Sequence, residues 1–407
     1  MRYEFKKLFA SRLMWVMLLL TFGYMVFIPL REVWGAAGEL RQEARAYSEA
    51  LEDAVSEGIS GDGLRARADS FISTGTEALM QDSSYTPKYG TTPMGDFLAM
   101  LKSSDTLRYV QRSFESDRAE LVRGMVIHNA SERRKPVPDS YLIRANEKAI
   151  GLYNRRVALE PVSTGIREDI RYNCFNFSSW EYVMTALCVL MTVRLFTLEY
   201  TSGAFRLVNT SRRTVQSLFR RKYLTAVLTA SAVLTVQAVF ELVFCAAVFG
   251  LGNLTLPLQQ LPMFELCPYS LSIAGFYAIK LPLRILAYTA VISVTALVTS
   301  AARRPLVSLA VSLPVTECAA AAVKVLYTLL SDSESPRRSL LGIYDTLRIL
   351  LPQSLTDLRS YLTGFDCFSL FGYPVPRLAG CAAAALLISA VCAAGGYFAS
   401  GRIRRKA

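Results

Sequence analysis

Residues 378–401 read LAGCAAAALLISAVCAAGGYFASG and contain no charged side chain. As an α-helix this run would be about 36 Å long at 1.5 Å per residue, which is enough to cross the hydrocarbon core of a bilayer. The residues that follow, RIRRK at 402–406, are strongly basic. An uncharged run that ends in a basic cluster is typical of a transmembrane helix ending at the cytoplasmic face.

Five other runs are also long and mainly apolar, and three of them contain one or two charged residues. The first could also be read as a cleaved signal peptide, because basic residues precede it. We favour a retained helix, because the run is longer than the usual apolar core of a signal peptide and the residues that follow, Val33 to Gly38, make a poor small-x-small cleavage site. The sequence therefore predicts an all-α integral membrane protein with about six transmembrane helices, at residues 13–30, 182–198, 223–249, 285–302, 305–330 and 378–401.

Composition agrees with this fold class. Hydrophobic residues make up 52% of the 407, mean hydropathy is +0.29, and charged residues are 19%, below the roughly 25% of soluble domains. The net charge of +12 is not spread as a continuous basic stripe with aromatic platforms, which a nucleic-acid surface would need. Residues 31–180 hold 20 Lys and Arg against 22 Asp and Glu, so the remainder of the chain carries the excess of +14.

That basic excess predicts the orientation. It gathers in four clusters, at residues 2–12, 206–222, 303–304 and 402–406. Six helices would put all four clusters on one side, which the positive-inside rule makes cytoplasmic. We therefore expect a multi-pass protein of the cell membrane with both termini in the cytoplasm. The segments 31–180, 250–284 and 331–377 would then lie outside.

The long segment 31–180 is polar and large enough to be a domain. Apolar residues at helical spacing predict helices at 39–55, 95–126 and 140–157, and Ser60-Gly61-Asp62-Gly63 predicts a turn. A shorter external hairpin at 331–377 carries two apolar stretches, which we expect to form amphipathic helices at the outer surface.

Known catalytic and cofactor motifs are absent from the sequence. No P-loop, G-x-G-x-x-G, H-E-x-x-H or G-x-S-x-G pattern occurs. The only histidine is His128 and no CxxC spacing is present, so a metal site is not expected. Three cysteines, Cys174, Cys267 and Cys367, fall in predicted external segments, and the sequence does not choose whether two of them pair. We expect no enzyme and no cofactor in this chain.

The predicted cytoplasmic segment 199–222 mixes apolar positions with basic ones. This pattern fits an amphipathic helix against the membrane or a soluble partner, and it fits equally a basic anchor for the flanking helices. Charged residues within the apolar runs are candidates for a substrate pathway, since charges inside a membrane are costly and usually functional. These candidates are Glu241, Glu317 and Lys324.

The same segment resembles the coupling region of the ABC-2 family of transporter permeases. The resemblance is carried by Glu199-x3-Gly203, a following apolar turn, Ser211-Arg212, and Lys222 at the start of the next helix. One position departs from the family pattern, because Thr210 stands near a place where proline is common. The layout is similar too: a basic amphipathic start (1–12), one helix (13–30), a large external domain, then five helices (181–401) with a re-entrant hairpin before the last, and a basic tail (402–407).

The resemblance implies a permease subunit that pairs with a second permease, identical or not, and binds a separate ABC ATPase subunit holding ATP and Mg²⁺. It implies export of a substrate by alternating access. It further implies that ATPase closure is passed to the helices through residues Glu199, Gly203, Arg206, Ser211, Arg212, Arg213 and Lys222. A different class remains open: a membrane-anchored sensor or scaffold whose external domain binds a ligand. That alternative does not explain five helices after the external domain.

Overall fold

The structure, a computed structural model, describes most of the chain. The residues described are 2–33, 37–73, 86, 88–89, 93–112, 117–155, 178–201, 215–249, 254–261, 264–318, 321, 325–326, 347 and 349–401. Among them the fold is almost entirely α-helical, with a single two-stranded sheet. The predicted all-α class is therefore confirmed.

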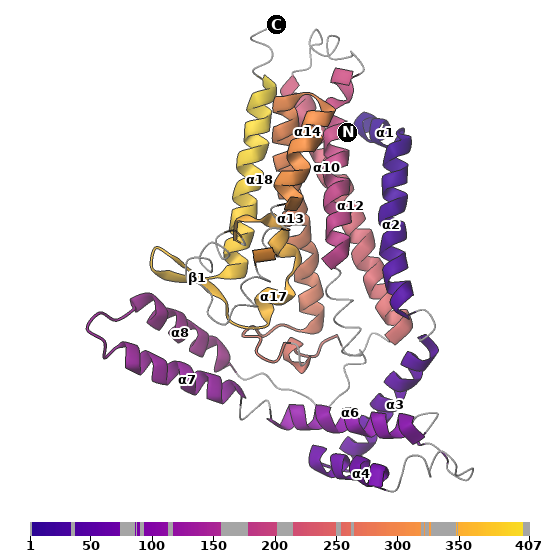
Figure 1. The fold of residues 1–407 in the computed structure, drawn as a ribbon, viewed down its shortest axis with the longest axis vertical. Helices are drawn as coiled ribbons and strands as arrows, with labels where there is room; N and C mark the ends of the chain where they lie inside the picture. The colour runs from indigo at the N-terminus through magenta and orange to yellow at the C-terminus, as the bar shows by residue number, and fades with distance from the viewer. Residues whose placement is uncertain are drawn as a thin grey trace.

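A bundle of apolar helices forms one half of the molecule (Figure 1). Within the described residues, four helices are long and apolar enough to cross a membrane, which is compatible with a membrane protein. They are α10 (Ser178–Thr201), α12 (Val215–Phe249), α13 (Ile273–Ala302) and α18 (Arg377–Gly401). A fifth span is added if α1 (Arg2–Phe9) and α2 (Arg12–Val33), which meet at a bend of 75°, count as one.

The predicted number of six spans is not reached in the part of the chain that the structure describes. The predicted run 305–330 is represented by α14 (Pro305–Leu313), which continues as the short π-helix η3 (Pro314–Cys318). Most of the rest of that run lies outside the described residues. The six-helix count therefore stays a prediction.

Among the four candidate spans, α12 and α13 begin well before their predicted apolar runs. α12 begins at Val215 and α13 at Ile273, because basic and polar residues at a helix end do not stop a helix. At the start of α13, the Ser272 hydroxyl accepts a hydrogen bond of 3.0 Å from the backbone N–H of Gly275, which is a standard N-cap. Its other end is closed by Arg303 in the left-handed conformation, and Pro305 then opens α14.

The bundle is held by small residues and a buried apolar core. A Cβ on Gly396 of α18 would lie 2.9 Å from the Phe219 ring, and one on Gly395 would lie 3.1 Å from Leu297. Glycine therefore lets α18 approach α12 and α13 closely. The core beside this contact joins α2, α10, α12 and α13, with Met184 and Tyr288 among its fully buried side chains.

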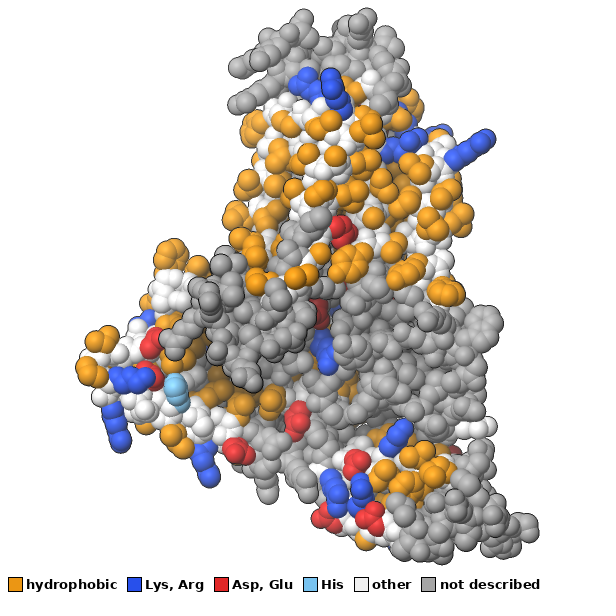
Figure 2. Space-filling model, viewed as in Figure 1, with side chains coloured by type: hydrophobic (Ala, Val, Ile, Leu, Met, Phe, Trp, Pro, Cys, Tyr) orange, Lys and Arg blue, Asp and Glu red, His pale blue; other side chains and the backbone are white. Residues whose placement is uncertain are grey.

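Five peripheral helices lie beyond one end of the bundle (Figure 1). They are α3 (Ala37–Ser56), α4 (Gly61–Ser73), α6 (Pro93–Arg112), α7 (Asp117–Glu132) and α8 (Ser140–Tyr153). Figure 2 shows hydrophobic side chains covering the bundle, with acidic and basic side chains gathered over these peripheral helices. The predicted turn at residues 60–63 is wrong in part: Ser60 caps α4 by accepting from the Gly63 N–H, and the next three residues form its first turn.

Of the two amphipathic helices predicted before α18, the first lies mostly outside the described residues, and the segment that follows it differs from the prediction. It forms the 3-10 helix η4 (Pro352–Thr356), the one-turn helix α17 (Arg359–Leu362), and a hairpin of β1 (Cys367–Leu370) and β2 (Tyr373–Pro376). The two short helices pack against the bundle, since Leu355 and Tyr361 share a core with Ala287, Ala290, Cys381 and Ala385. Cys267 and Cys367 carry free thiols, and Cys174 lies outside the described residues.

Candidate functional site: two buried charge clusters

The first cluster, which we call the α1 cluster, contains Glu4, Lys7, Glu199 and Lys222. Glu199 stands near the end of α10, and its two carboxylate oxygens accept hydrogen bonds from two lysines. Lys7 donates to one oxygen at 2.9 Å, and Lys222 of α12 donates to the other. Lys7 also lies 3.6 Å from Glu4. Glu4, Glu199 and Lys222 are buried, so the four charges form an alternating chain that joins three helices.

The bend between α1 and α2 positions this cluster. The indole N–H of Trp15 donates to the carbonyl of Phe9 at 2.7 Å, and the two rings are in contact. This holds α1 across the end of the bundle, while Leu8 enters the core. Lys7 therefore contacts Glu199 from α1, whereas the other partner of Glu199, Lys222, belongs to α12.

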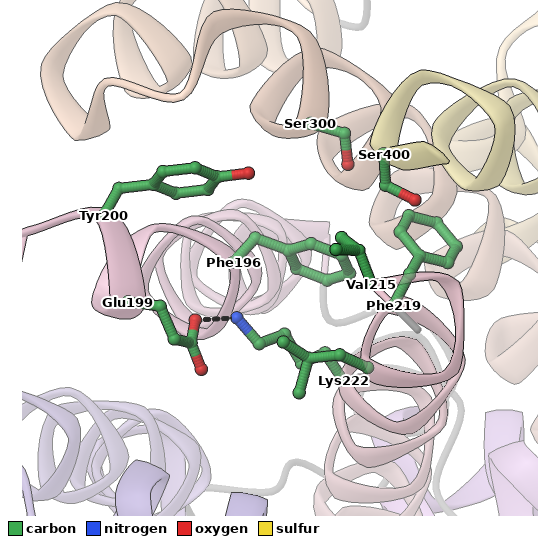
Figure 3. Close-up of a pocket in the computed structure, with 9 residues that line it drawn as sticks. Phe196, Glu199, Tyr200, Val215, Phe219, Lys222, Ser300 and Ser400 are labelled. Atoms are coloured by element: carbon green, nitrogen blue, oxygen red, sulfur yellow. Dashed lines mark hydrogen bonds and ion pairs between the residues drawn. The ribbon is translucent and has the colours of Figure 1, made fainter. Parts of the chain in front are cut away.

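A small cavity lies beside the α1 cluster. It is lined by residues near the ends of α10, α12, α13 and α18. Its volume is about 30 Å³, room for a few water molecules and not for an organic substrate. Figure 3 shows the Glu199–Lys222 ion pair on one side of it and the hydroxyls of Ser300 and Ser400 on the other. Its remaining lining comes from Phe196, Tyr200, Val215, Leu218 and Phe219.

Two of the predicted coupling residues are thus in contact. Glu199 and Lys222 are 23 positions apart in sequence and meet because α10 and α12 run side by side. The others, Gly203, Arg206, Ser211, Arg212 and Arg213, lie outside the described residues. The sequence reading missed Glu4 and Lys7, although the spacing of Glu4 and Lys7 on one helical face was a usable signal.

The second cluster, which we call the Glu241 cluster, lies toward the other end of α12. It contains Gln237 and Glu241 of α12 with Lys280 and Arg284 of α13, all buried. Glu241 accepts from Lys280 at 2.9 Å, from the Gln237 amide at 2.8 Å and from Arg284 at 3.5 Å. One carboxylate thus pairs with two cations in a buried site. In such a low-dielectric interior an uncompensated charge strongly destabilises the fold.

The sequence predicted a helix at 285–302, which begins after Lys280 and Arg284. In the structure α13 begins at Ile273 and continues through Pro282, so both cations lie within the helix. The two cations are four positions apart and therefore lie on one face of α13, opposite Glu241. A pair of cations at this spacing beside an apolar run was the signal that could have found them.

The remaining predicted pathway residues are less fully placed. Glu317 lies in η3, half buried. Its carboxylate, together with Glu181 and Arg284, acts electrostatically on the buried hydroxyl of Tyr288. Lys324 lies outside the described residues, so its predicted pairing with Glu317 stays a prediction.

Both clusters join neighbouring helices through buried ion pairs. Each carboxylate has cations as neighbours, and the described residues contain no group of His, Cys, Asp and Glu that could hold a metal ion. Neither cluster presents a nucleophile beside a base. Comparison of the chain with protein-family models, with curated proteins and with solved structures finds no match in any of the three.

Proposed function

We propose that this chain is the permease subunit of an ATP-driven transporter of the ABC-2 type, exporting a substrate by alternating access. ATP and Mg²⁺ would be held by a separate ATPase subunit, and a second permease would complete the pathway. In this proposal the bundle crosses the cell membrane with the α1 cluster at the cytoplasmic end and the peripheral helices outside.

The observation that carries the proposal is the buried Glu199–Lys222 ion pair. The pair joins the end of α10 to the first turns of α12, and these two helices flank residues 202–214. A partner that pushes this connecting segment must act on both helices. A buried ion pair at their junction transmits that push, because separating its charges in an apolar interior is costly.

Lys7 provides a second contact through which a movement of α10 is transmitted, in this case to α1. It binds the Glu199 carboxylate from α1, so a displacement of α10 also changes the contacts of the helix that lies across the end of the bundle. Because both lysines are bound at once, the Glu199 carboxylate can lose its contact with one lysine and stay paired with the other. Such an exchange of partners allows a helix end to move between two states at low cost.

The test is a pull-down of the tagged full chain from its native membrane in mild detergent, followed by mass spectrometry. We expect a P-loop ATPase to co-purify, and to be lost when Arg212 and Arg213 are both changed to Glu. The matched control is Arg133→Glu with Arg134→Glu, which reverses two adjacent exposed charges between α7 and α8. The control should retain the ATPase.

Two results would contradict the proposal. One is a chain that comes down without any ATPase, which would favour the sensor or scaffold. The other is ATP-dependent transport in proteoliposomes that is unchanged by the Arg212 and Arg213 reversals.

A further inference from the structure

The β1–β2 hairpin ends in an apolar tip that the protein leaves uncovered. Phe371 is 95% exposed, Tyr373 is 65% exposed, and Leu370, the last residue of β1, is also exposed. Phe371 and Gly372 both have positive φ, 51° and 81°, as a two-residue type I′ turn requires. Asn or Gly usually fills the first of these positions, since a side chain there strains the backbone. The conformation of the turn therefore does not explain why a large aromatic side chain stands at position 371.

The base of the hairpin is firmly attached. The Phe368 ring occupies the space that a Cβ on Gly380 would need, with its nearest atom 2.2 Å from that position. Asp366 forms an ion pair of 3.0 Å with Arg377 at the start of α18. On the other side, Arg144 and Lys148 of α8 donate to the carbonyls of Gly372 and Pro374, at 3.3 and 3.0 Å. The tip is therefore held in a fixed position.

The hairpin lies where the foot of a spanning helix meets the peripheral helices. β2 ends at Pro376 and α18 begins at Arg377, so the tip is only about 13 Å of strand from the start of the span. Figure 1 shows the hairpin projecting sideways from the foot of α18. Along α18 itself, Leu386 and Leu387 are exposed, so the helix that follows the hairpin also presents apolar side chains on its surface.

Charge and residue type indicate what covers the tip. Arg144 stacks on the Tyr373 ring at 5.2 Å, and both Arg144 and Lys148 are exposed beside it. Aromatic rings next to basic side chains are typical of the boundary between acyl chains and phosphate headgroups. We infer that the hairpin tip, Leu370 to Tyr373, inserts into the leaflet of the bilayer at the Arg377 end of α18, with Phe371 among the acyl chains and Arg144 and Lys148 at the phosphates.

The test uses tryptophan fluorescence in vesicles of equal parts phosphatidylcholine and phosphatidylglycerol, with and without bromine on the acyl chains. The native Trp15, Trp34 and Trp180 are replaced by Phe, and Phe371→Trp is introduced into the full chain. A variant that keeps only Trp15, an exposed residue of the spanning helix α2, gives the quenching of a lipid-facing ring. Val137→Trp is the matched control, since Val137 is 86% exposed in the loop between α7 and α8.

We expect brominated lipid to quench Phe371→Trp about as strongly as Trp15, with emission shifted to shorter wavelength, and to quench Val137→Trp far less. Quenching of Phe371→Trp no greater than that of the control would overturn the inference.

A second measurement covers the case in which the tryptophan variants do not fold. A benzophenone amino acid at position 371 of the otherwise unchanged chain is photolysed in the native membrane, and the adducts are identified by mass spectrometry. Phospholipid adducts support insertion. Adducts only to a second copy of the chain, or to another protein, would overturn it and assign the tip to a protein interface.

Discussion

Lys222 and Glu241 lie 19 residues apart on α12, about 28 Å along the helix, and each belongs to a buried cluster of charges. The α1 cluster takes its members from three helices, and two carboxylates balance two ammonium groups. The Glu241 cluster takes its members from two helices, and one carboxylate serves two cations. The two ends of one helix are therefore fixed by different arrangements.

The two clusters differ in the ion-pair partners that remain when one charged member is lost. In the chain Glu4–Lys7–Glu199–Lys222, loss of a terminal member still leaves an opposite charge beside each interior member. In the Glu241 cluster, loss of the carboxylate removes the one ion-pair partner that Lys280 and Arg284 share. The α1 cluster is thus suited to an end of the bundle that rearranges, and the Glu241 cluster to an end that stays fixed.

The largest effect is expected for Glu241→Gln. This change keeps the shape of the side chain but leaves Lys280 and Arg284 buried beside each other without their shared counter-charge. Breaking a buried ion pair by removing one partner costs about 3–5 kcal/mol. The free energy of unfolding should fall by about that amount, measured by denaturant titration of the full chain in lipid bicelles.

The control for this prediction is the double variant Glu241→Gln with Lys280→Met, which removes one of the two cations. It should be more stable than Glu241→Gln alone. If Glu241→Gln costs less than 1 kcal/mol, a value typical of exposed pairs, the cluster does not fix this end of the bundle and the comparison fails.

A smaller effect is expected for Lys222→Met. Glu199 loses one hydrogen-bond partner but keeps the ammonium of Lys7, so the cost should be about 1–3 kcal/mol, the range for a lost charged hydrogen bond. The same titration measures it, and hydrogen exchange should rise at the end of α10. Glu4→Gln serves as the matched control, because it removes the other terminal member of the chain of charges, whose carboxylate lies 3.6 Å from Lys7, and its loss should cost less.

A loss for Lys222→Met as large as that for Glu241→Gln would show that Lys7 does not substitute for Lys222. The proposed exchange of partners at Glu199 would then be wrong.

The long apolar helices were predictable from sequence, because a helix suited to face lipid is apolar along its whole length and needs no particular partner. The partners of the buried charges were not. Nothing in the sequence says that Glu241 faces Lys280, since that depends on how α12 and α13 are rotated against each other. Glu199 and Lys222 were recognised only through a family resemblance, and their contact came from the structure.

The β1–β2 hairpin was missed for a different reason. Its sequence, Phe368-Ser369-Leu370 followed by Phe371-Gly372 and Tyr373-Pro374-Val375, contains a Gly turn position, but Phe is an unusual first turn residue. The strands are also short and carry two prolines, which usually argue against a strand. Both features are tolerated here because the hairpin has free edges and is held by α8 and α18.

The smallest effect is expected for an ion pair outside the bundle, Asp53 with Lys88, which gives the reference for the two buried clusters. The ammonium of Lys88 lies 2.8 Å from the Asp53 carboxylate, and its hydrogen bond holds the pKa of Asp53 below its usual value. Both side chains are largely exposed, so water and salt screen the attraction. A carboxyl whose pKa is lower in the folded state stabilises the fold above its unfolded pKa, near 3.9, and this contribution is lost as pH falls through the folded pKa.

Asp53→Asn should therefore raise hydrogen exchange in α3 slightly at neutral pH, and the variant and the unchanged protein should converge in acid. Glu52→Gln, next along α3, removes an equal charge and serves as control for net charge. A difference that persists at pH values below the folded pKa of Asp53 would mean that the pair acts through packing and not through charge. An effect at neutral pH as large as that of Lys222→Met would mean that burial adds little to an ion pair in this protein, and the contrast between the bundle and its periphery would lose its basis.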